Sequence, residues 1–375
     1  MKKITVGITG QSGIIETYLS AFLRTKSDQI DCILFNRESF QDKDRLTHFV
    51  SQCDFIVHLA GMFRGDPGKI YDCNISLANQ LIHSLESGDH PPHIIYISSI
   101  QETRDNSYGR SKYECRKLLE TWAKKNNARV TSLVIPHEFG PFGKPYYNSV
   151  VSTFSYQLTH NLLPKIETDA ELDLVYAGTI VGKIYKIISG EVSETVITIP
   201  ADKRMKVSDL LLRLQQYKQT YFDNHIFPDV RDEFDAALFN TFRSFIDQDY
   251  FPVIPPCNRD ERGYLIELVK ESGGGQTFFS VTKPGITRGN HFHIKKIERF
   301  CVVAGEALIE LRRIGTDSVI SYHVDGTNAS FIDIPVFYTH CITNTGNTPL
   351  TTVFWANEIF DPRNPDTCYE NVHLV

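Results

Sequence analysis

Short apolar runs alternate with amphipathic stretches through the first third of the chain. The apolar runs are typical of buried strands and cover Ile4–Thr9, Cys32–Phe35, Phe55–Leu59, Ile94–Ile97 and Val130–Ile135. The stretches between them place apolar residues at helical spacing, as in Ile15–Arg24, Ser76–Leu85 and Ser111–Lys124. Strands that alternate with helices form a parallel sheet with helices on both faces. The pattern therefore predicts a Rossmann-type, doubly wound α/β sheet.

The pattern changes twice further along the chain. Residues 150–248 are mostly helical, with breaks at Pro164, Pro200 and Pro228. Beyond the proline-rich stretch 250–256, short alternating strands are separated by turns such as residues 273–275 and 344–347, which is typical of an all-β barrel. We predict two domains: residues 1–249, an α/β domain with a helical connector, and residues 250–375, a β-barrel.

Composition narrows the class of protein. The 375 residues are 22% charged and 41% hydrophobic, as in soluble globular proteins. The net charge of -6 argues against a nucleic-acid partner held by general electrostatics. The 8 cysteines lack paired spacing, which indicates reduced thiols, and no apolar run reaches the length of a membrane span. We expect a cytoplasmic protein without membrane insertion.

The C-terminal half carries four potential metal ligands at characteristic spacing. His291 and His293 lie two apart, so on a strand both point to the same side. Glu298 follows between Gly285 and Gly305, and His340 ends a second segment that starts at Pro335. Imidazole and carboxylate suit zinc, iron, nickel and manganese. The spacing predicts a divalent metal site, with zinc as the leading candidate.

These two segments resemble the double motif of the cupins, which form a jelly-roll barrel. The resemblance covers Gly285 to Asn344. Phe337 stands where the family usually has glycine, so we expect an altered turn and a narrower cavity mouth, with no ligand lost.

The N-terminal half shows features of a dinucleotide-binding site. Gly10 and Gly13 follow the first strand, where glycines let the backbone approach a pyrophosphate at a helix N-terminus. The third glycine of the full pattern is replaced by Glu16, whose carboxylate would repel a pyrophosphate unless it turned outward. Arg37 after the second strand favours NADPH, or is simply a solvated loop cation. The segment Leu59-Ala60-Gly61 leaves room for the adenosine side of the cofactor.

A candidate catalytic group follows the fourth strand. Tyr108 and Lys112 are four residues apart and share one face of a helix. The ammonium lowers the pKa of the phenol and binds the nicotinamide ribose, and the phenol passes a proton to a carbonyl oxygen. The hydroxyl of Ser99, or alternatively that of Ser98, orients the carbonyl.

Residues 1–245 resemble the extended short-chain dehydrogenase/reductase family, whose members act on nucleotide sugars. The resemblance implies Tyr108 as proton donor, Lys112 as its partner and Asn74 as the asparagine that supports the catalytic helix. The usual Arg-x-x-Asn segment is replaced by residues 134–137, ending in His137, and the usual Tyr-Val-Asp-Asp segment by residues 176–179. These departures bear on substrate binding more than on the chemistry.

Taken end to end, the chain resembles bifunctional capsular polysaccharide synthesis enzymes that join these two domains. The segments that carry this resemblance begin at Asn148, Lys283, Pro335 and Phe360. It implies a UDP-sugar substrate on the route to UDP-N-acetyl-L-fucosamine. The cupin would epimerise carbon 3 of a UDP-2-acetamido-2,6-dideoxy-4-hexulose, and the reductase half would reduce the 4-ketone with NADPH. Asn74 and Asn148 are then expected to bind substrate.

Further candidate residues lie around the cupin motif. Arg262 and Glu267 resemble cavity-lining residues of keto-sugar epimerases, although a strand-edge salt bridge between them is an equal alternative. Lys283 is the first candidate for the base, with Tyr338 and Lys296 as alternatives.

Two other functions remain open at this point. One is a 4-keto sugar reductase with a structural cupin. The other is a non-catalytic protein that senses sugar nucleotides, motivated by Glu16, Val134 and His137. Cupin barrels often pair through edge strands, so we expect a homodimer.

Overall fold

The computed structural model describes residues 3–374 except 11–12, 37, 88–90, 256, 261–262, 267, 272, 359–360, 362 and 364. The chain divides into two compact units. One consists of Met1–Thr153 and Ile166–Leu210, and the other of Phe154–Lys165 and Leu211–Val375. Residues 211–249, which the sequence analysis assigned to a connector of the first domain, therefore pack with the second unit.

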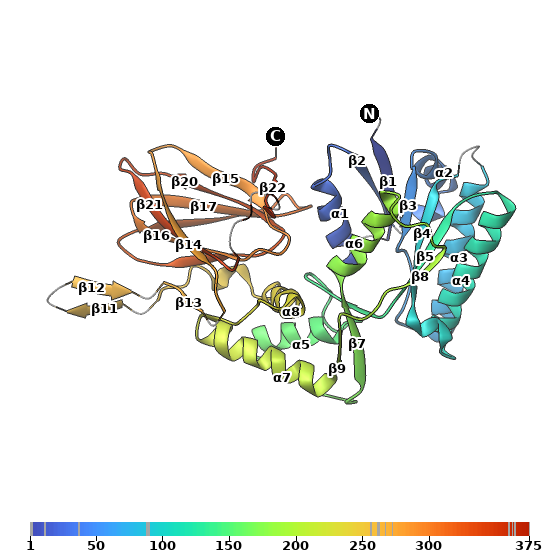
Figure 1. Cartoon of the computed structure of the whole chain (residues 1–375), viewed down its shortest axis with the longest axis horizontal. Helices are drawn as coiled ribbons and strands as arrows, with labels where there is room; N and C mark the ends of the chain where they lie inside the picture. The colour runs from blue at the N-terminus through green and yellow to red at the C-terminus, as the bar shows by residue number, and fades with distance from the viewer. Residues whose placement is uncertain are drawn as a thin grey trace. The chain divides into compact units, whose positions relative to one another are not determined.

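A six-stranded parallel sheet forms the centre of the first unit (Figure 1). Its order is β2 (Ile30–Phe35), β1 (Ile4–Thr9), β3 (Phe55–His58), β4 (His93–Ser99), β5 (Val130–Ile135) and β8 (Val196–Thr198). Strands β4 and β5 are buried along their whole length, as expected for central strands of a sheet covered on both faces.

Helices cover both faces of this sheet (Figure 1). On one face α2 (Lys43–Ser51), α3 (Pro67–Leu85) and α4 (Ser107–Lys125) share a core with the sheet that includes Phe49, Leu81 and Trp122. On the other face α1 (Ile14–Arg24) packs against α6 (Ala177–Ile188). The predicted doubly wound fold is confirmed.

A small second sheet and two short helices complete this unit. The sheet pairs β6 (His137–Phe139) with β7 (Glu171–Tyr176) in parallel and β7 with β9 (Lys203–Lys206) in antiparallel register. The 3-10 helices are η1 (Glu38–Gln41) and η2 (Ile100–Thr103), and η2 follows β4 directly.

Helices lead from the α/β unit into the barrel. Helices α5 (Val150–Thr159) and α7 (Val207–Tyr217) each begin in the first unit and end in the second. The second unit also contains the π-helix η3 (Lys218–Asp223), α8 (Glu233–Arg243) and η4 (Gln248–Tyr250). Four short strands of this unit form two small sheets: β10 (Ile226–Phe227) pairs with β13 (Lys270–Glu271), and β11 (Cys257–Asp260) forms a hairpin with β12 (Gly263–Ile266).

The barrel of the second unit consists of two antiparallel sheets (Figure 1). One has the order β14 (Gln276–Thr282), β21 (Leu350–Ala356), β16 (Glu298–Ala304) and β19 (Phe331–Ile334). The other has the order β18 (Val319–Asp325), β17 (Glu306–Arg313), β20 (Tyr338–Asn344), β15 (Thr287–Phe292) and β22 (Cys368–Tyr369). This confirms the predicted all-β half, in which β15 pairs with β20 although the two strands are far apart in the chain.

Candidate functional site

A cavity of about 490 Å³ opens above the carboxyl ends of β1, β3 and β4. The predicted Gly10, Gly13, Leu59, Ala60 and Gly61 all line it. Gly10 has φ +90, and a Cβ there would lie 2.5 Å from the backbone nitrogen of Ala60, so only glycine fits. A Cβ at Gly13 would meet nothing within 4 Å, which leaves the N-terminus of α1 open to a ligand. The geometry suits a dinucleotide, whereas Arg37 lies outside the described residues.

Glu16 also lines this cavity and is buried in the first turn of α1. The sequence analysis expected a carboxylate here to weaken the binding of a pyrophosphate unless it turned outward. The side chain does not turn out to solvent, so its charge acts within the cavity that would hold the cofactor.

Tyr108, Lys112 and Ser99 come together at the other end of the cavity. Asn106 caps α4 by accepting a 2.7 Å hydrogen bond from the backbone of Gly109. A Cβ at Gly109 would lie 2.1 Å from the carbonyl oxygen of Gln101, so this glycine lets α4 start directly against η2. The first turn of α4 thereby brings Tyr108 into hydrogen-bond contact with Ser99.

Burial shifts the pKa values of the tyrosine and the lysine in opposite directions. It lowers the pKa of Lys112 from 10.5 to about 8, against the opposing influence of Cys115, Glu138 and Glu102. Burial and then the charge of Glu138 raise the pKa of Tyr108, while the hydrogen bond from Ser99 lowers it. The Lys112 ammonium also lies 4.6 Å from the centre of the Tyr96 ring, a cation–π contact that helps to hold it.

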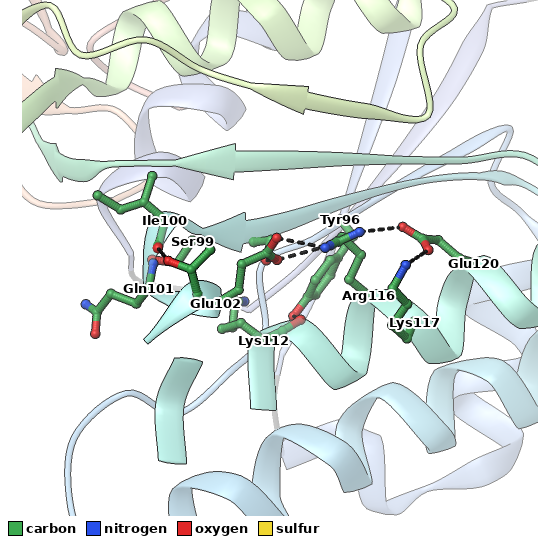
Figure 2. A network of polar contacts seen from close by, with 11 residues as sticks. Tyr96, Ser99, Ile100, Gln101, Glu102, Lys112, Arg116, Lys117 and Glu120 are labelled. Atoms are coloured by element: carbon green, nitrogen blue, oxygen red, sulfur yellow. Dashed lines mark hydrogen bonds and ion pairs between the residues drawn. The ribbon is translucent and has the colours of Figure 1, made fainter. Parts of the chain in front are cut away.

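Ser98 takes part in a different network, which Figure 2 shows in part. Its hydroxyl donates a 2.7 Å hydrogen bond to Glu102, whose carboxylate accepts from Arg116 at 2.8 and 3.0 Å. Arg116 also binds Glu120 at 2.8 Å. Because Ser98 is engaged with Glu102, the contact with Tyr108 falls to Ser99, the first of the two alternatives.

A second cavity, of about 710 Å³, adjoins the first. It is lined by the predicted Asn148 and by Ser99, Tyr108, Gln101 and His137. The buried Nδ1 of His137 has no hydrogen-bond partner within the described structure. The second cavity therefore shares Tyr108 with the cavity that suits a dinucleotide, so a molecule bound in it would lie beside both.

Asn74 lies outside both lining sets. Its side chain accepts a 2.6 Å hydrogen bond from the backbone of Met62 and donates to the Met62 carbonyl and to Ser111, at 2.8 and 2.9 Å. It thus ties the loop after β3 to α4, which fits the supporting role more closely than a direct contact with substrate.

Sequence reasoning missed Glu138, which lines both cavities. It lies on β6, next to His137. The only signal in the sequence was that this segment departs from the usual pattern.

The four predicted metal ligands cluster inside the barrel. One donor atom from each of His291, His293, Glu298 and His340 lies within 4.8 Å of the others. His291 and His340 are direct partners across β15 and β20, and Glu298 begins β16. Two donors on one tetrahedral zinc, with bonds of about 2.0–2.2 Å, lie roughly 3.4 Å apart. The side chains therefore need to close by only a small amount to bind one ion.

The hydrogen bonds around the cluster leave lone pairs facing its centre. Nδ1 of His293 lies 2.5 Å from the carbonyl of Asp366, and Nδ1 of His340 lies 3.2 Å from that of Tyr338. A carbonyl only accepts, so both Nδ1 atoms carry the proton and both Nε2 atoms present a lone pair. These Nε2 atoms are buried without a hydrogen-bond partner in the described structure, 3.1 and 3.5 Å from an oxygen of Glu298. Acceptors that face one another in this way suit a cation between them.

The protonation states of the ligands agree with this. Burial, and then the neighbouring His340 and His293, lower the pKa of His291 to about 3, so its imidazole is neutral.

Asp366 fixes the segment that joins two of the ligands, and sequence reasoning missed its role. Its carboxylate accepts from the backbone of Ile294, Lys295 and Lys296, at 3.1, 3.0 and 2.8 Å. Its carbonyl accepts from His293. Only the resemblance of the segment from Phe360 to Thr367 pointed to this region.

Phe337 keeps the backbone of the glycine that it replaces. Its φ is +62, a conformation that costs a bulky residue roughly 1–2 kcal/mol. The turn persists because the Phe337 amide donates to the carbonyl of His293 at 2.8 Å and its ring is buried. Phe337 does not line the cavity beside Glu298, and the narrowing of the cavity mouth stays a prediction.

The cavity beside Glu298 has a volume of about 260 Å³, and one of the three candidates for the base lines it. Lys296 lines it, is buried and has its ammonium 3.6 Å from Glu298. Lys283 is exposed and, like Tyr338, is absent from the lining. The role of Lys283 stays a prediction, and Arg262 and Glu267 lie outside the described residues.

Comparison with known proteins defines the class. Residues 6–191 match the NAD dependent epimerase/dehydratase family, and residues 258–368 match the polysaccharide biosynthesis C-terminal domain. None of the helices in the described part of the chain is both long and apolar enough to cross a membrane.

Two full-length relatives define the particular family. The chain is 31% identical over 363 residues, 96% of each protein, to UDP-2-acetamido-2,6-beta-L-arabino-hexul-4-ose reductase of Pseudomonas aeruginosa. It is 34% identical to the capsular polysaccharide assembling protein CapF of Staphylococcus aureus, whose crystal structure it matches with a TM-score of 0.64 over 98% of this chain and 100% of that one. A partial relative, 27% identical over 117 residues (28% of this chain and 78% of that one), is the spore coat polysaccharide biosynthesis protein SpsL of Bacillus subtilis. The chain belongs to the family of this reductase and CapF, as its sequence predicted.

Proposed function

We propose that the protein is a bifunctional UDP-sugar enzyme of surface polysaccharide synthesis, on the route to UDP-N-acetyl-L-fucosamine. In this proposal the cupin epimerises carbon 3 of a UDP-2-acetamido-2,6-dideoxy-4-hexulose and the reductase half then reduces the 4-ketone. The observation that carries the reductase activity is the meeting of Ser99, Tyr108 and Lys112 where the two cavities adjoin. The name of the Pseudomonas aeruginosa relative supports a 4-keto UDP-sugar as substrate.

The residues of the first unit suit ketone reduction. NADPH, when bound, supplies the hydride. Ser99 donates a hydrogen bond that orients the ketone oxygen, and Tyr108 transfers its hydroxyl proton to that oxygen. Lys112 binds the nicotinamide ribose, and its ammonium stabilises the phenolate that Tyr108 becomes. Asn148, which lines the second cavity, would bind the sugar.

The cupin half suits removal of the proton next to the ketone. His291, His293, Glu298 and His340 would hold a divalent ion, which we propose to be zinc. Such an ion polarises the ketone oxygen and stabilises the negative charge that develops there. The observation that supports this is the pair of buried, unpartnered Nε2 atoms facing Glu298. A base takes the proton from carbon 3, with Lys283, Lys296 and Tyr338 as the candidates, and reprotonation on the opposite face inverts the carbon.

The first experiment measures NADPH oxidation with the UDP-4-keto sugar and the metal content of the purified protein. We expect turnover and about one zinc per chain. Tyr108→Phe should remove turnover and keep the zinc, whereas His291→Ala should lose the zinc. Wild-type protein that binds cofactor but leaves the ketone untouched would contradict the reductase.

Two alternatives predict different outcomes. A reductase with a structural cupin would consume NADPH but would not exchange the proton at carbon 3. A protein that only senses sugar nucleotides would fail to bind NADPH in a titration, the outcome that Glu16 would favour.

We further propose that the enzyme is a homodimer. Light scattering should give twice the mass of 42.8 kDa, and a monomer mass would contradict this.

A further inference from the structure

The two cavities of the reductase half share a small set of lining residues. Phe63, Ser99, Tyr108, Glu138, Asn148 and Ser149 line both. A hydride that leaves a cofactor in one cavity for a ketone in the other has to cross at this junction, beside Tyr108. Of these shared residues, Glu138 is the one that carries a carboxyl group.

Glu138 is an unusual residue for such a place. It lies on β6, where the pairing of His137 with Leu174 and of Phe139 with Tyr176 in β7 fixes its backbone. Burial raises the pKa of its carboxyl group, and the Lys112 ammonium opposes that rise. Glu138 in turn raises the pKa values of both Tyr108 and Lys112. It therefore acts electrostatically on both members of the catalytic pair.

The charge changes of the reaction indicate what a carboxylate at this position can do. As the hydride moves from the dihydronicotinamide ring to the ketone carbon, the neutral ring becomes a cation. Tyr108 simultaneously gives its proton to the ketone oxygen, which completes the alcohol. Lys112 alone would set a second positive charge near the developing cation, and in a buried site such repulsion is only weakly screened.

We propose that Glu138 is a catalytic residue that stabilises the positive charge developing on the nicotinamide ring and thereby favours hydride donation to the substrate. This rests on the proposed reductase function and deepens it.

The test compares Glu138→Gln, which keeps size and removes charge, with Glu138→Asp, which keeps charge. The dissociation constants of NADP⁺ and NADPH are measured by titration, together with kcat and KM for reduction of the UDP-4-keto sugar. We expect Glu138→Gln to weaken NADP⁺ relative to NADPH by roughly 10- to 100-fold, as loss of one buried charge interaction implies. It should lower kcat at least tenfold with little change in KM, and Glu138→Asp should recover part of both losses.

Glu114→Gln on α4, an exposed residue outside both cavities, is the matched control and should change neither quantity. Equal weakening of NADP⁺ and NADPH by Glu138→Gln would overturn the inference, because it would indicate a merely structural role. A raised KM with an unchanged affinity ratio would overturn it in favour of substrate recognition. If wild-type protein bound neither form of the cofactor, the reductase proposal would fail together with this inference.

Discussion

Lys112 is a buried amine, and its charge destabilises the folded protein. Burial lowers its pKa from 10.5 to about 8. Between these values the unfolded chain binds more protons than the folded one, so stability rises with pH across this window. Below pH 8 the full cost of the buried charge is present, roughly 3 kcal/mol from about 1.4 kcal/mol per pKa unit. A site that needs a charged lysine for catalysis gives up stability for it.

Lys112→Met should therefore stabilise the first unit at pH 7 and lose that advantage by about pH 10.5. The difference in unfolding free energy between variant and wild type should shrink by roughly 3 kcal/mol over this range. Urea unfolding in a Trp355→Phe background measures this difference. Trp122 is then the one remaining tryptophan, so its signal reports on the core of the first unit alone.

Lys117→Met is the matched control, since Lys117 lies on the same helix with an exposed side chain. Its difference from wild type should stay constant between pH 8 and 10.5. The account of Lys112 would be wrong if its own difference were equally constant.

Glu16 offers a second prediction at the same scale. Glu16→Gln should tighten the binding of NADPH about three- to thirtyfold, because it removes a negative charge from the cavity that would hold the pyrophosphate. Isothermal titration at low and high salt measures the gain, which should shrink as salt screens it. Glu86→Gln, exposed at the end of α3, should have no effect, and unchanged affinity in Glu16→Gln would refute the expected repulsion.

Residues with fixed spacing could be predicted from the sequence, whereas residues that act through tertiary contacts could not. The helical spacing of Tyr108 and Lys112 and the strand alternation of His291 and His293 are local properties. The position of Glu138 depends on the tertiary fold, because β6 places it at the junction of the two cavities.

At the level of elements, the segment between β15 and β16 holds two of the metal ligands at its ends. Three successive backbone amides of this segment donate to the carboxylate of Asp366, which lies 70 to 72 residues further along the chain. This contact sets the distance between His293 and Glu298. Such support orients metal ligands in many proteins.

Asp366→Ala should weaken zinc binding roughly 10- to 100-fold while leaving all four ligands in place. Competition with a chromophoric chelator measures the affinity. Asp317→Ala, in the exposed turn after β17, should bind zinc as the wild type does. Equal affinities for the two variants would show that the contact does not support the ligands.

Elements with strong periodicity were predicted well, and boundaries that depend on packing were not. Strands β1 and β5 begin and end where their apolar runs do. Helix α3 begins at Pro67, earlier than its apolar pattern, because Asp66 caps it by accepting from the backbone of Lys69. Residues 211–249 pack with the barrel through contacts such as that of Tyr221 with Asp333, which no local pattern reveals.

In the whole molecule, the proposed function involves two chemical steps at two separate sites. In the proposed function the epimerised product keeps its ketone and is the substrate of the reductase half, so reduction draws an otherwise balanced epimerisation forward.

The two activities should therefore be separable by mutation. His340→Ala should abolish exchange at carbon 3 but reduce a pre-epimerised ketone at close to the wild-type rate. Tyr108→Phe should show the reverse, with reduction lowered by a factor of about 100 to 10,000, as expected for loss of a general acid. Loss of both activities in either variant, with folding intact, would contradict the division.

The most direct test of this division is solvent deuterium incorporation at carbon 3 of the UDP-4-keto sugar, measured by mass spectrometry without NADPH. The account predicts rapid incorporation with zinc-loaded wild type and with Tyr108→Phe, and none with His340→Ala or after zinc is removed. Incorporation that persists without the metal, or its absence from the loaded wild type, would contradict the central claim.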